Sequence, residues 1–414
     1  MSDFIMAASG VLFFFLFAFL MFTFIVYAVS LFVRRSFPAF QPAVSIVIPS
    51  YNEEKNIAAC LDHVLASTYP NHKLEVIVVD DGSSDATLEV VKSYSSVICL
   101  SQQHKGKSAA LTLGARAARH DFIITIDADT TVDKDCIGHL VRPLFNQRIG
   151  ATTGVCSVLN RNSLLGMFQY IEYRYNDLIK SSFSIVFNSG IWFFGALAAY
   201  RKSALEKVGY FKADTLAEDM DVALELKLAG YDTYNVKDAF SRTIVPETFT
   251  AFFRQRQRWW LGVLHALVKN KKLLSLRSSP SILFLYLNQF WWSIYSFVSL
   301  PIIIYQVHYW LPYNSQSVAN FSGYIFRWFT LAGPFYVIYK IPVWGISLYS
   351  IFGVIAGLIS TVMIIASLRL FREAWHPLNL LAIFFYFPYT IWLNLVTFIS
   401  CLSFKRLRSQ SFIG

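Results

Sequence analysis

The segment LEVIVVDDGSSD, residues 74–85, joins a short apolar run to an acidic turn. A continuous apolar and β-branched run of this length predicts a strand that is buried on both faces of a sheet. Asp80, Asp81 and Gly82 follow the run at once, and this composition is typical of a tight turn. The segment therefore predicts a buried strand whose carboxyl end carries carboxylates.

The same unit recurs on both sides of this segment. Three other apolar runs predict strands, VSIVIP at 44–49, VICLS at 97–101 and DFIITID at 121–127. Helical patterns lie between the strands, at residues 53–67, 85–96 and 106–119. Strands that alternate with helices in this way predict a parallel sheet covered by helices on both faces. We therefore expect residues 36–245 to form an α/β domain with a mostly parallel sheet.

Polar residues follow three of these strands at the point where each strand ends. They lie in PSYNEE (49–54), DDGSSD (80–85) and DADTT (127–131). Ligands of open α/β sheets bind beyond the carboxyl ends of the strands. One acidic loop could be an ordinary solvated turn, but three such loops at strand ends indicate one shared site.

Two carboxylates in the last of these loops favour a metal site. Asp127 and Asp129 lie two residues apart, so both side chains point to the same side of an extended segment. Such a pair can hold a divalent cation, since Mg²⁺ typically links carboxylates to substrate phosphates. A chance DxD turn is the alternative, and the other acidic strand ends argue against it. Lys107, at the start of the 106–119 helix, could contact a phosphate or be solvated.

A further acidic group opens the helix expected in TLAEDMDVALELKLAGY, residues 215–231. Glu218, Asp219 and Asp221 lie in its first turn, where the helix dipole favours acids. The helix dipole accounts well for one acidic residue in this turn, but less well for three. A carboxylate near a metal site could instead act as the general base on an acceptor hydroxyl.

Part of the chain should lie in a bilayer, because 55% of its 414 residues are hydrophobic and only 15% are charged. Soluble domains carry about 25% charged residues, and a spanning helix needs about 20 apolar ones. Four segments meet that length, at 5–33, 282–311, 344–368 and 379–402. The segment 322–341 is weaker, because charged residues and a proline interrupt it. A signal peptide is the alternative for the first segment, which is long for one and lacks a basic start.

Basic residues beside these segments predict the topology. Arg34, Arg35 and the run KNKK (269–272) place the α/β domain in the cytoplasm, at the plasma membrane. The basic tail at 405–408 should lie on the same side, which needs an odd number of spans, and five if 322–341 crosses. The predicted parts are listed in chain order: a transmembrane helix at 1–35, the cytoplasmic domain at 36–245, an amphipathic interface region at 246–280, and a transmembrane region of three or four spans at 281–414.

Net charge and cysteines limit the partners further. The net charge of +10 lies largely near the expected membrane edge, which favours anionic lipid and anionic substrates over nucleic acid. The five cysteines are scattered, without the paired spacing of a zinc site or a disulfide framework. We therefore expect free thiols and no nucleic-acid partner.

The stretch FTAFFRQRQRWWLGVLHALV, residues 249–268, predicts a helix at the membrane surface. At 100° per residue, Gln255, Arg258, Trp259 and Gly262 share one face, and apolar residues cover the other. Arg256 lies on the apolar side, where its charged end should snorkel towards water.

The polar face of this helix suits a sugar transfer site. The indole of Trp259 offers a flat apolar surface to a sugar ring, and Arg258 offers a charge to a leaving diphosphate. An ordinary interfacial helix is the alternative, but it does not explain why Gln, Arg and Trp share one face. A second amphipathic stretch at 164–180 places Gln169 and Glu172 at helical spacing near the same region. Tyr173 of that stretch fits core packing equally well.

Four motifs occur in order between residues 44 and 262: DDGS (80–83), DAD (127–129), AED (217–219) and QRQRW (255–259). Together they resemble the processive family 2 glycosyltransferases, which include synthases of cellulose, chitin, hyaluronan and poly-N-acetylglucosamine. Ala217 departs from the family's usual threonine. FFGALAAYRKSAL (193–205), with GATTG, GMFQYIEY and VPET, is more similar to the poly-N-acetylglucosamine synthases.

The resemblance implies a GT-A fold, Mg²⁺ or Mn²⁺ as cofactor, and inversion at the sugar. It also implies roles for residues, namely Asp81, Asp127, Asp129, Asp219, Gln255, Arg258 and Trp259. Glu218, Lys107, Gln169 and Glu172 are added from the residue patterns above, and the combined sets are listed here. The catalytic set is Asp219, Glu218 and Arg258; the nucleotide-sugar set is Asp81, Lys107, Asp127, Gln255 and Arg258; the acceptor set is Trp259, Gln169 and Glu172; the metal ligands are Asp129 and Asp127.

We expect a membrane-embedded β-glycosyltransferase that polymerises a sugar from a UDP-sugar, with UDP-GlcNAc favoured. Its partners would be the donor, the growing polysaccharide and the lipid bilayer, and the sequence leaves an accessory membrane subunit open. It would export the polymer through its own membrane segments. One alternative is a single-transfer enzyme that acts on a lipid-linked acceptor such as a polyprenyl phosphate. Another is a transporter or scaffold with a non-catalytic sugar-nucleotide domain.

Overall fold

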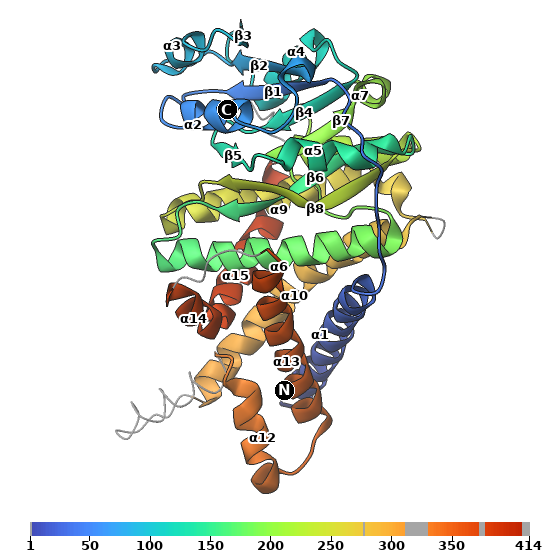
Figure 1. Cartoon of the computed structure of the whole chain (residues 1–414). Helices are drawn as coiled ribbons and strands as arrows, with labels where there is room; N and C mark the ends of the chain where they lie inside the picture. Colours follow the sequence, from blue (N-terminus) through green and yellow to red (C-terminus); the bar gives the residue numbers. More distant parts are fainter. Residues whose placement is uncertain (1, 276–277, 311–329, 372–376, 408–414) are drawn as a thin grey trace.

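The computed structural model describes residues 2–275, 278–310, 330–371 and 377–407. An α/β domain stands above a group of long helices, and the amino-terminal helix lies among the latter (Figure 1). The two parts correspond to the soluble and apolar regions of the sequence. The predicted α/β class is therefore confirmed.

One sheet of eight strands forms the centre of the domain. The strands are β1 (Val44–Ser50), β2 (Leu74–Asp80), β3 (Val97–Ser101), β4 (Phe122–Ile126), β5 (Thr130–Val132), β6 (Ile149–Val158), β7 (Leu197–Arg201) and β8 (Asp232–Thr243). Their order is β3-β2-β1-β4-β7-β6-β8-β5. The four predicted strands are β1 to β4, and they pair in parallel. β6 and β8 are also parallel, whereas β7 and β5 run antiparallel to their neighbours, so the sheet is mixed.

Helices cover both faces of the sheet, as expected. They are α2 (Ile57–Leu65), α3 (Thr87–Lys92), α4 (Lys107–Ala117), α5 (Cys136–Val141), α7 (Lys202–Val208) and α8 (Glu218–Leu228). Alternate residues of β1 enter opposite cores: Ile46 and Ile48 pack with α2 and α5, and Val47 packs with α4. Gly114 lets α4 approach this strand, because a Cβ there would lie 2.3 Å from Val47 Cγ1. Because β1 to β4 are parallel and packed in this way, their carboxyl ends lie at one edge of the sheet.

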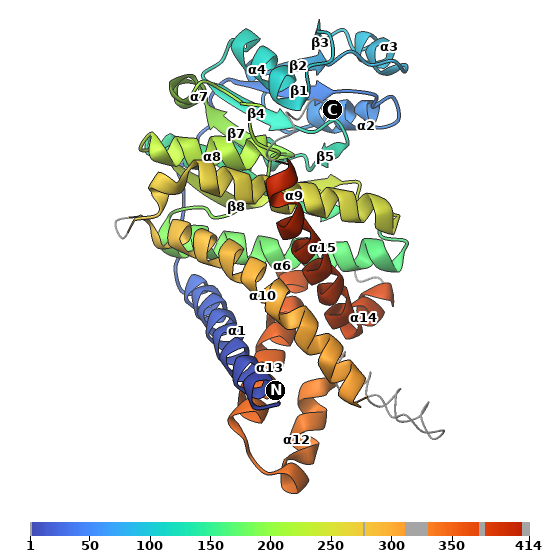
Figure 2. The same cartoon turned by 180° about the vertical axis from the view of Figure 1, so that it is seen from behind.

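Long helices form the other part of the molecule. They are α1 (Ser2–Ser30), α6 (Leu164–Phe187), α9 (Phe249–Lys269), α10 (Pro280–Trp310), α12 (Gly333–Trp344), α13 (Leu348–Leu370), α14 (Pro377–Phe384) and α15 (Tyr386–Leu407). The helix α6 lies across the molecule between the sheet and the lower helices (Figure 1). Seen from behind, α15 crosses α9 (Figure 2). The two predicted amphipathic helices, α6 and α9, thus separate the sheet from the apolar part.

Fewer spans are found than the five that we predict. Within the described ranges, Gly10–Ser30 and Ser350–Leu370 are long and apolar enough to cross a membrane, and the bent pair Pro377–Phe384 and Pro388–Phe404 would add a third. The predicted segment 282–311 corresponds to α10, which is not among these candidates. Most of the weak segment 322–341 lies outside the described residues or in the short α12.

Candidate functional site

The loops at the strand ends meet around Lys107, the first residue of α4. Its Nζ lies 2.6 Å from Asp127 Oδ1, after β4, and 3.4 Å from Glu218 Oε1, at the start of α8. Burial alone would lower the pKa of the Lys107 ammonium, but the carboxylates of Asp127 and Glu218 outweigh burial and raise it. Lys107 thus links an acid that follows β4 to an acid that opens α8, and one site shared by the three strand-end loops stays a prediction.

Asp129 lies in the same cluster and accepts hydrogen bonds at Oδ1 from the hydroxyls of Thr130 (3.1 Å) and Thr243 (3.3 Å). Burial, and then the charges of Asp127 and Glu53, raise the pKa of the Asp129 carboxyl to about 6. Glu53 was not among the predicted site residues, although it lies in the polar loop that follows β1. Its own pKa is raised chiefly by burial.

These carboxylates suit a metal ion that a substrate helps to hold. Within the described ranges, no group of three or more His, Cys, Asp or Glu residues is arranged to hold a metal alone. Mg²⁺ sites often use one or two carboxylates and complete the shell with water and substrate phosphates. Burial, and then the charges of Asp127 and Glu53, disfavour the ionised form of Asp129. A divalent cation would favour that form, so the two aspartates fit the predicted ion.

Asp219 is held by backbone amides on both carboxylate oxygens. Its Oδ2 accepts from the Gly195 amide and its Oδ1 from the Met220 amide, each at 2.7 Å. A Cβ at Gly195 would lie 2.6 Å from Asp219 Cβ, so this close approach requires glycine. Burial, and then the charge of Glu218, raise the pKa of the Asp219 carboxyl to about 6. A carboxylate with a pKa near neutrality suits a general base.

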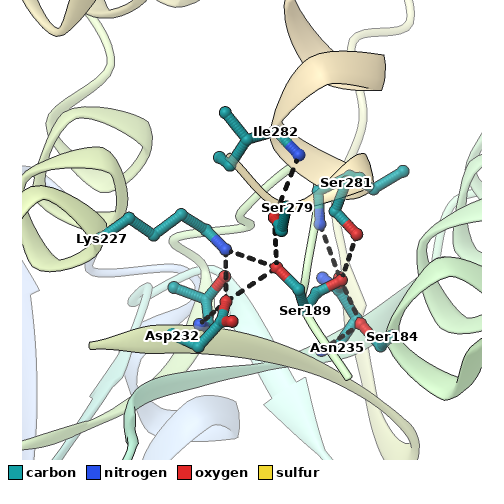
Figure 3. A network of polar contacts seen from close by, with 10 residues as sticks. Ser184, Ser189, Lys227, Asp232, Asn235, Ser279, Ser281 and Ile282 are labelled. Atoms are coloured by element: carbon teal, nitrogen blue, oxygen red, sulfur yellow. Dashed lines mark hydrogen bonds and ion pairs between the residues drawn. The ribbon is translucent and has the colours of Figure 1, made fainter. Parts of the chain in front are cut away.

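A polar network holds the segment that leads to Gly195 (Figure 3). Ser189 donates to Asp232 Oδ1 at 2.8 Å, and Lys227 Nζ contacts the same oxygen at 2.5 Å. The hydroxyl of Ser279, just before α10, lies 3.1 Å from that of Ser189. The network therefore links the end of α8, the start of β8 and the approach to α10 beside the segment that positions Asp219.

Asp81 is buried, and its carboxylate organises the loop before α4. Its Oδ1 accepts from Gln102 Nε2 (2.6 Å) and the Lys105 amide (2.9 Å), and its Oδ2 accepts from the Gly106 amide (2.8 Å). The ring of His104, in the same loop, stacks on Tyr51 at 4.2 Å between centroids. The structure thus uses Asp81 to shape the loop that begins α4. A contact between Asp81 and a nucleotide stays a prediction.

The predicted polar face of α9 lies against the start of α8. A Cβ at Gly262 would lie 2.7 Å from Ala217 Cβ and 2.9 Å from its amide nitrogen, so the two backbones are close. Trp259, on the same face, is half-buried, with its ring 6.1 Å from that of Tyr173. Arg258 is exposed and makes no recorded polar contact within the described part of the chain. The α9 face therefore adjoins the segment that carries Asp219.

The prediction that Arg256 snorkels towards water is wrong. Its side chain is 6% exposed, and its Nη2 lies 2.9 Å from Glu172 Oε2. The hydroxyl of Tyr389 in α15 donates to the same oxygen, and Arg256 Nη1 donates to Gln255 Oε1 at 2.9 Å. The helix α15 packs on this side of α9, and Glu172 of α6 supplies a carboxylate, so the guanidinium is neutralised inside the protein.

Gln169 and Glu172 lie beside α9 but are engaged by protein groups. Gln169 is fully buried and donates from Nε2 to the carbonyls of Pro246 (2.9 Å) and Leu165 (3.3 Å). It thereby ties α6 to the segment before α9. An acceptor could reach Gln169 only after a rearrangement, and acceptor contact at either residue stays a prediction.

Part of the chain matches a family model and curated proteins. Residues 45–209 match the model "Glycosyl transferase family 2". Over 233 residues, the chain is 33% identical to a poly-beta-1,6-N-acetyl-D-glucosamine synthase of Staphylococcus aureus and 32% identical to one of Staphylococcus epidermidis. Each match covers 55% of this chain and 56% of the relative, so the chain spans about half the length of the curated relatives it matches.

A solved structure shares the fold over nearly the whole chain. It is the mannosyltransferase PcManGT from Pyrobaculum calidifontis in complex with GDP-Man and Mn²⁺. The TM-score is 0.63 at 19% identity, and the match covers 97% of this chain and 99% of that one. At this identity the likeness shows the fold alone.

Proposed function

We propose that this chain, whose residues 45–209 form a glycosyl transferase family 2 domain, is an inverting, metal-dependent glycosyltransferase that extends a β-linked polysaccharide. The donor would be a UDP-sugar, with UDP-GlcNAc favoured by the names of the two staphylococcal relatives. The observation that carries the proposal is the strand-end cluster, defined as Asp127, Asp129, Glu218, Asp219 and Lys107. In this cluster the carboxyl of Asp219 has a pKa near neutrality. It lies beside Asp127 and Asp129, two carboxylates of the kind that bind divalent cations.

The donor would lie over the carboxyl ends of β1, β2 and β4. Asp129 and Asp127 would hold Mg²⁺ or Mn²⁺, and the bound ion would supply positive charge to the donor diphosphate. The Mn²⁺ and GDP-Man in the mannosyltransferase structure support this class of cofactor and donor. Lys107 could move from Asp127 to a phosphate oxygen once the ion neutralises the aspartates.

Transfer would be one in-line displacement. The acceptor hydroxyl oxygen attacks the anomeric carbon from the face opposite the diphosphate. The new carbon–oxygen bond forms as the bond to phosphate breaks, which inverts the sugar and releases UDP. The hydroxyl proton passes to the carboxylate of Asp219, whose orientation the Gly195 amide holds. The exposed guanidinium of Arg258 would take up charge on the departing diphosphate.

The acceptor would approach along α9. Gly262, one turn after Trp259, lies against the segment that carries Asp219, and a half-buried indole suits the apolar face of a sugar ring. We place the protein in the plasma membrane with the family 2 domain in the cytoplasm, so that a growing chain could leave through the membrane helices. Single transfer to a lipid-linked acceptor is the second candidate. Such an enzyme would use the same strand-end cluster.

The test uses the full chain in nanodiscs with Mg²⁺ or Mn²⁺. UDP-GlcNAc, UDP-Glc, UDP-GlcA and UDP-Gal are supplied in turn, and UDP release and product length are measured. We expect long polymer from one donor, lost in Asp219→Asn. One-sugar products on an added polyprenyl phosphate would replace the proposal by the second candidate. Failure to turn over any UDP-sugar would contradict both.

A further inference from the structure

The buried charge in the middle of the QRQRW motif plays no part in the mechanism above. Arg256 pairs with Glu172 of α6, and Glu172 also accepts from the hydroxyl of Tyr389 in α15. We call these three residues the interface cluster. They come from three helices, and Glu172 is 13% exposed, so the contacts are largely shielded from water. The cluster joins α9 to a helix of the candidate membrane region.

The guanidinium of Arg256 also lies over aromatic rings. Its central carbon is 4.4 Å from the ring centroid of Trp259, 5.0 Å from that of Phe252 and 5.6 Å from that of Tyr173. These distances are within the range of cation–π attraction, which is strongest for tryptophan. The Trp259 contact is the shortest of the three. Because Trp259 is only half-buried, part of its ring stays open.

We propose that Arg256 is a positioning residue that holds the indole of Trp259 towards the acceptor, and that Glu172 and Tyr389 in turn hold Arg256. The inference rests on the proposed function, because it assigns the open part of the ring to an acceptor sugar. It makes the orientation of the acceptor platform depend on α15. A shift of α15 would therefore change the orientation of Trp259 at the acceptor end of the site.

Charge alone does not account for this arrangement. A buried ion pair often adds no more stability than apolar residues of the same size. A guanidinium can pair with a carboxylate and stack on a ring at the same time, because it is planar, whereas an ammonium cannot stack. Lysine at position 256 would keep the charge opposite Glu172 and lose the stacked contact with Trp259. That difference separates a positioning role from simple neutralisation.

The kinetic test compares Arg256→Lys and Tyr389→Phe with the native chain in nanodiscs, using a short β-linked oligosaccharide as acceptor. We expect Arg256→Lys to raise the acceptor KM roughly tenfold, from the loss of about 1–2 kcal/mol of stacking. Donor KM and UDP-sugar hydrolysis without acceptor should stay within about twofold, since the strand-end cluster is untouched. Tyr389→Phe should also raise the acceptor KM, but by a smaller factor. Tyr386→Phe, one turn earlier in α15, is the matched control and should change nothing. Equal losses in hydrolysis and transfer would overturn the proposal, because they would indicate general damage.

A second measurement does not depend on enzymatic activity. In protein labelled with 5-fluorotryptophan, the fluorine resonance of Trp259 is assigned by its loss in Trp259→Phe. We expect that resonance to shift in Arg256→Lys and Tyr389→Phe and to stay in place in Tyr386→Phe. An unmoved resonance in Arg256→Lys would overturn the positioning role. If the native chain neither hydrolyses nor transfers any donor, the proposed function fails, and this spectrum still decides whether Arg256 orients the indole.

Discussion

The strand-end cluster and the interface cluster both contain buried charge, but they balance it differently. At the strand ends, Lys107 pairs with Asp127 and Glu218 and also lies near Asp129 and Asp219, so among the described residues one cation faces four carboxylates. In the interface cluster, one guanidinium meets one carboxylate, and a phenol hydroxyl completes the set. The first cluster has an excess of negative charge, whereas the charges of the second cluster balance. An unbalanced cluster at an accessible strand edge can receive a cationic ligand, whereas a balanced, enclosed cluster holds helices in place.

The pKa values express the same contrast. Burial and neighbouring acids raise the pKa values of Asp129 and Asp219 to about 6, so these groups hold their charge weakly. Burial would lower the pKa of Arg256, but Glu172 outweighs that effect and raises it. The guanidinium of Arg256 therefore keeps its charge at any working pH, whereas Asp129 and Asp219 titrate near neutrality.

The largest effect should come from Asp219→Asn, which keeps the shape of the side chain and removes the base. We expect the transfer rate to fall by about 10²–10⁴-fold, the usual contribution of a general base, with UDP binding retained. UDP release kinetics and calorimetric UDP titration measure the two properties. Asp238→Asn, on the exposed surface of β8, is the control and should keep native activity. A loss below tenfold in Asp219→Asn would show that another group takes the proton.

The next effect concerns stability in the other cluster. Glu172→Ala should leave Arg256 buried without its partner, and this costs about 3–5 kcal/mol in comparable buried pairs. Glu172→Gln should be milder, because the amide oxygen can still accept from Arg256. The midpoint of thermal inactivation in detergent measures both variants. Glu89→Ala, on the exposed surface of α3, serves as the control. If Glu172→Ala matched that control, the pair would not hold the helices together.

The strand-end cluster could be predicted from the sequence because each member follows a recognisable apolar strand or opens a helix. β1 to β4 lie within one residue of their predicted ranges, and parallel strands bring their carboxyl ends to one edge. β6 was not predicted, because IGATTGVCSV combines glycine and hydroxyl residues with few large apolar ones. β8 is also polar along much of its length, so its pattern resembles a loop.

The interface cluster could not be predicted, because its contacts join helices far apart in the chain. The pattern of α9 indicates an apolar side that faces lipid or membrane helices, and α15 packs there in the structure. The pattern gives no sign of the carboxylate on α6, because Glu172 is 84 positions from Arg256 in sequence. The role of Gly195 could not be predicted, for a similar reason. A single glycine in a loop gives no signal until the fold brings Asp219 within 2.7 Å of its amide.

A glycine substitution tests whether the two clusters depend on the same helix. Gly262→Ala would place a Cβ 2.7 Å from Ala217 Cβ and 2.9 Å from its backbone nitrogen, which must push α9 from α8. Overpacking of this kind costs about 1–3 kcal/mol. We expect a lower inactivation midpoint together with a raised acceptor KM. Gly138→Ala in α5 is the matched control, because nothing lies within 4 Å of its new Cβ. A normal acceptor KM in Gly262→Ala would separate α9 from the acceptor site.

The smallest effect is a dependence of metal stabilisation on pH. The folded pKa values of Asp129 and Asp219, about 6, lie above the usual value of 3.8. The folded state therefore binds more protons than the unfolded state between these values, and stability falls as pH rises through that window. The penalty persists at neutral pH, where both groups are charged. Mn²⁺ should offset it, so the ion should raise the inactivation midpoint more at pH 7.5 than at pH 5.

The control for this prediction comes from the other cluster. Glu172→Gln leaves the strand-end acids untouched, and so its Mn²⁺ response should match that of the native chain at both pH values. Asp129→Asn removes one of the titrating groups and a proposed ligand, and so should lose most of the difference between pH 7.5 and pH 5. Equal Mn²⁺ stabilisation at the two pH values in the native chain would mean that the ion binds elsewhere. Because Arg256 keeps its charge throughout this range and no metal ligand is proposed in the interface cluster, only the strand-end cluster should respond to metal and pH together.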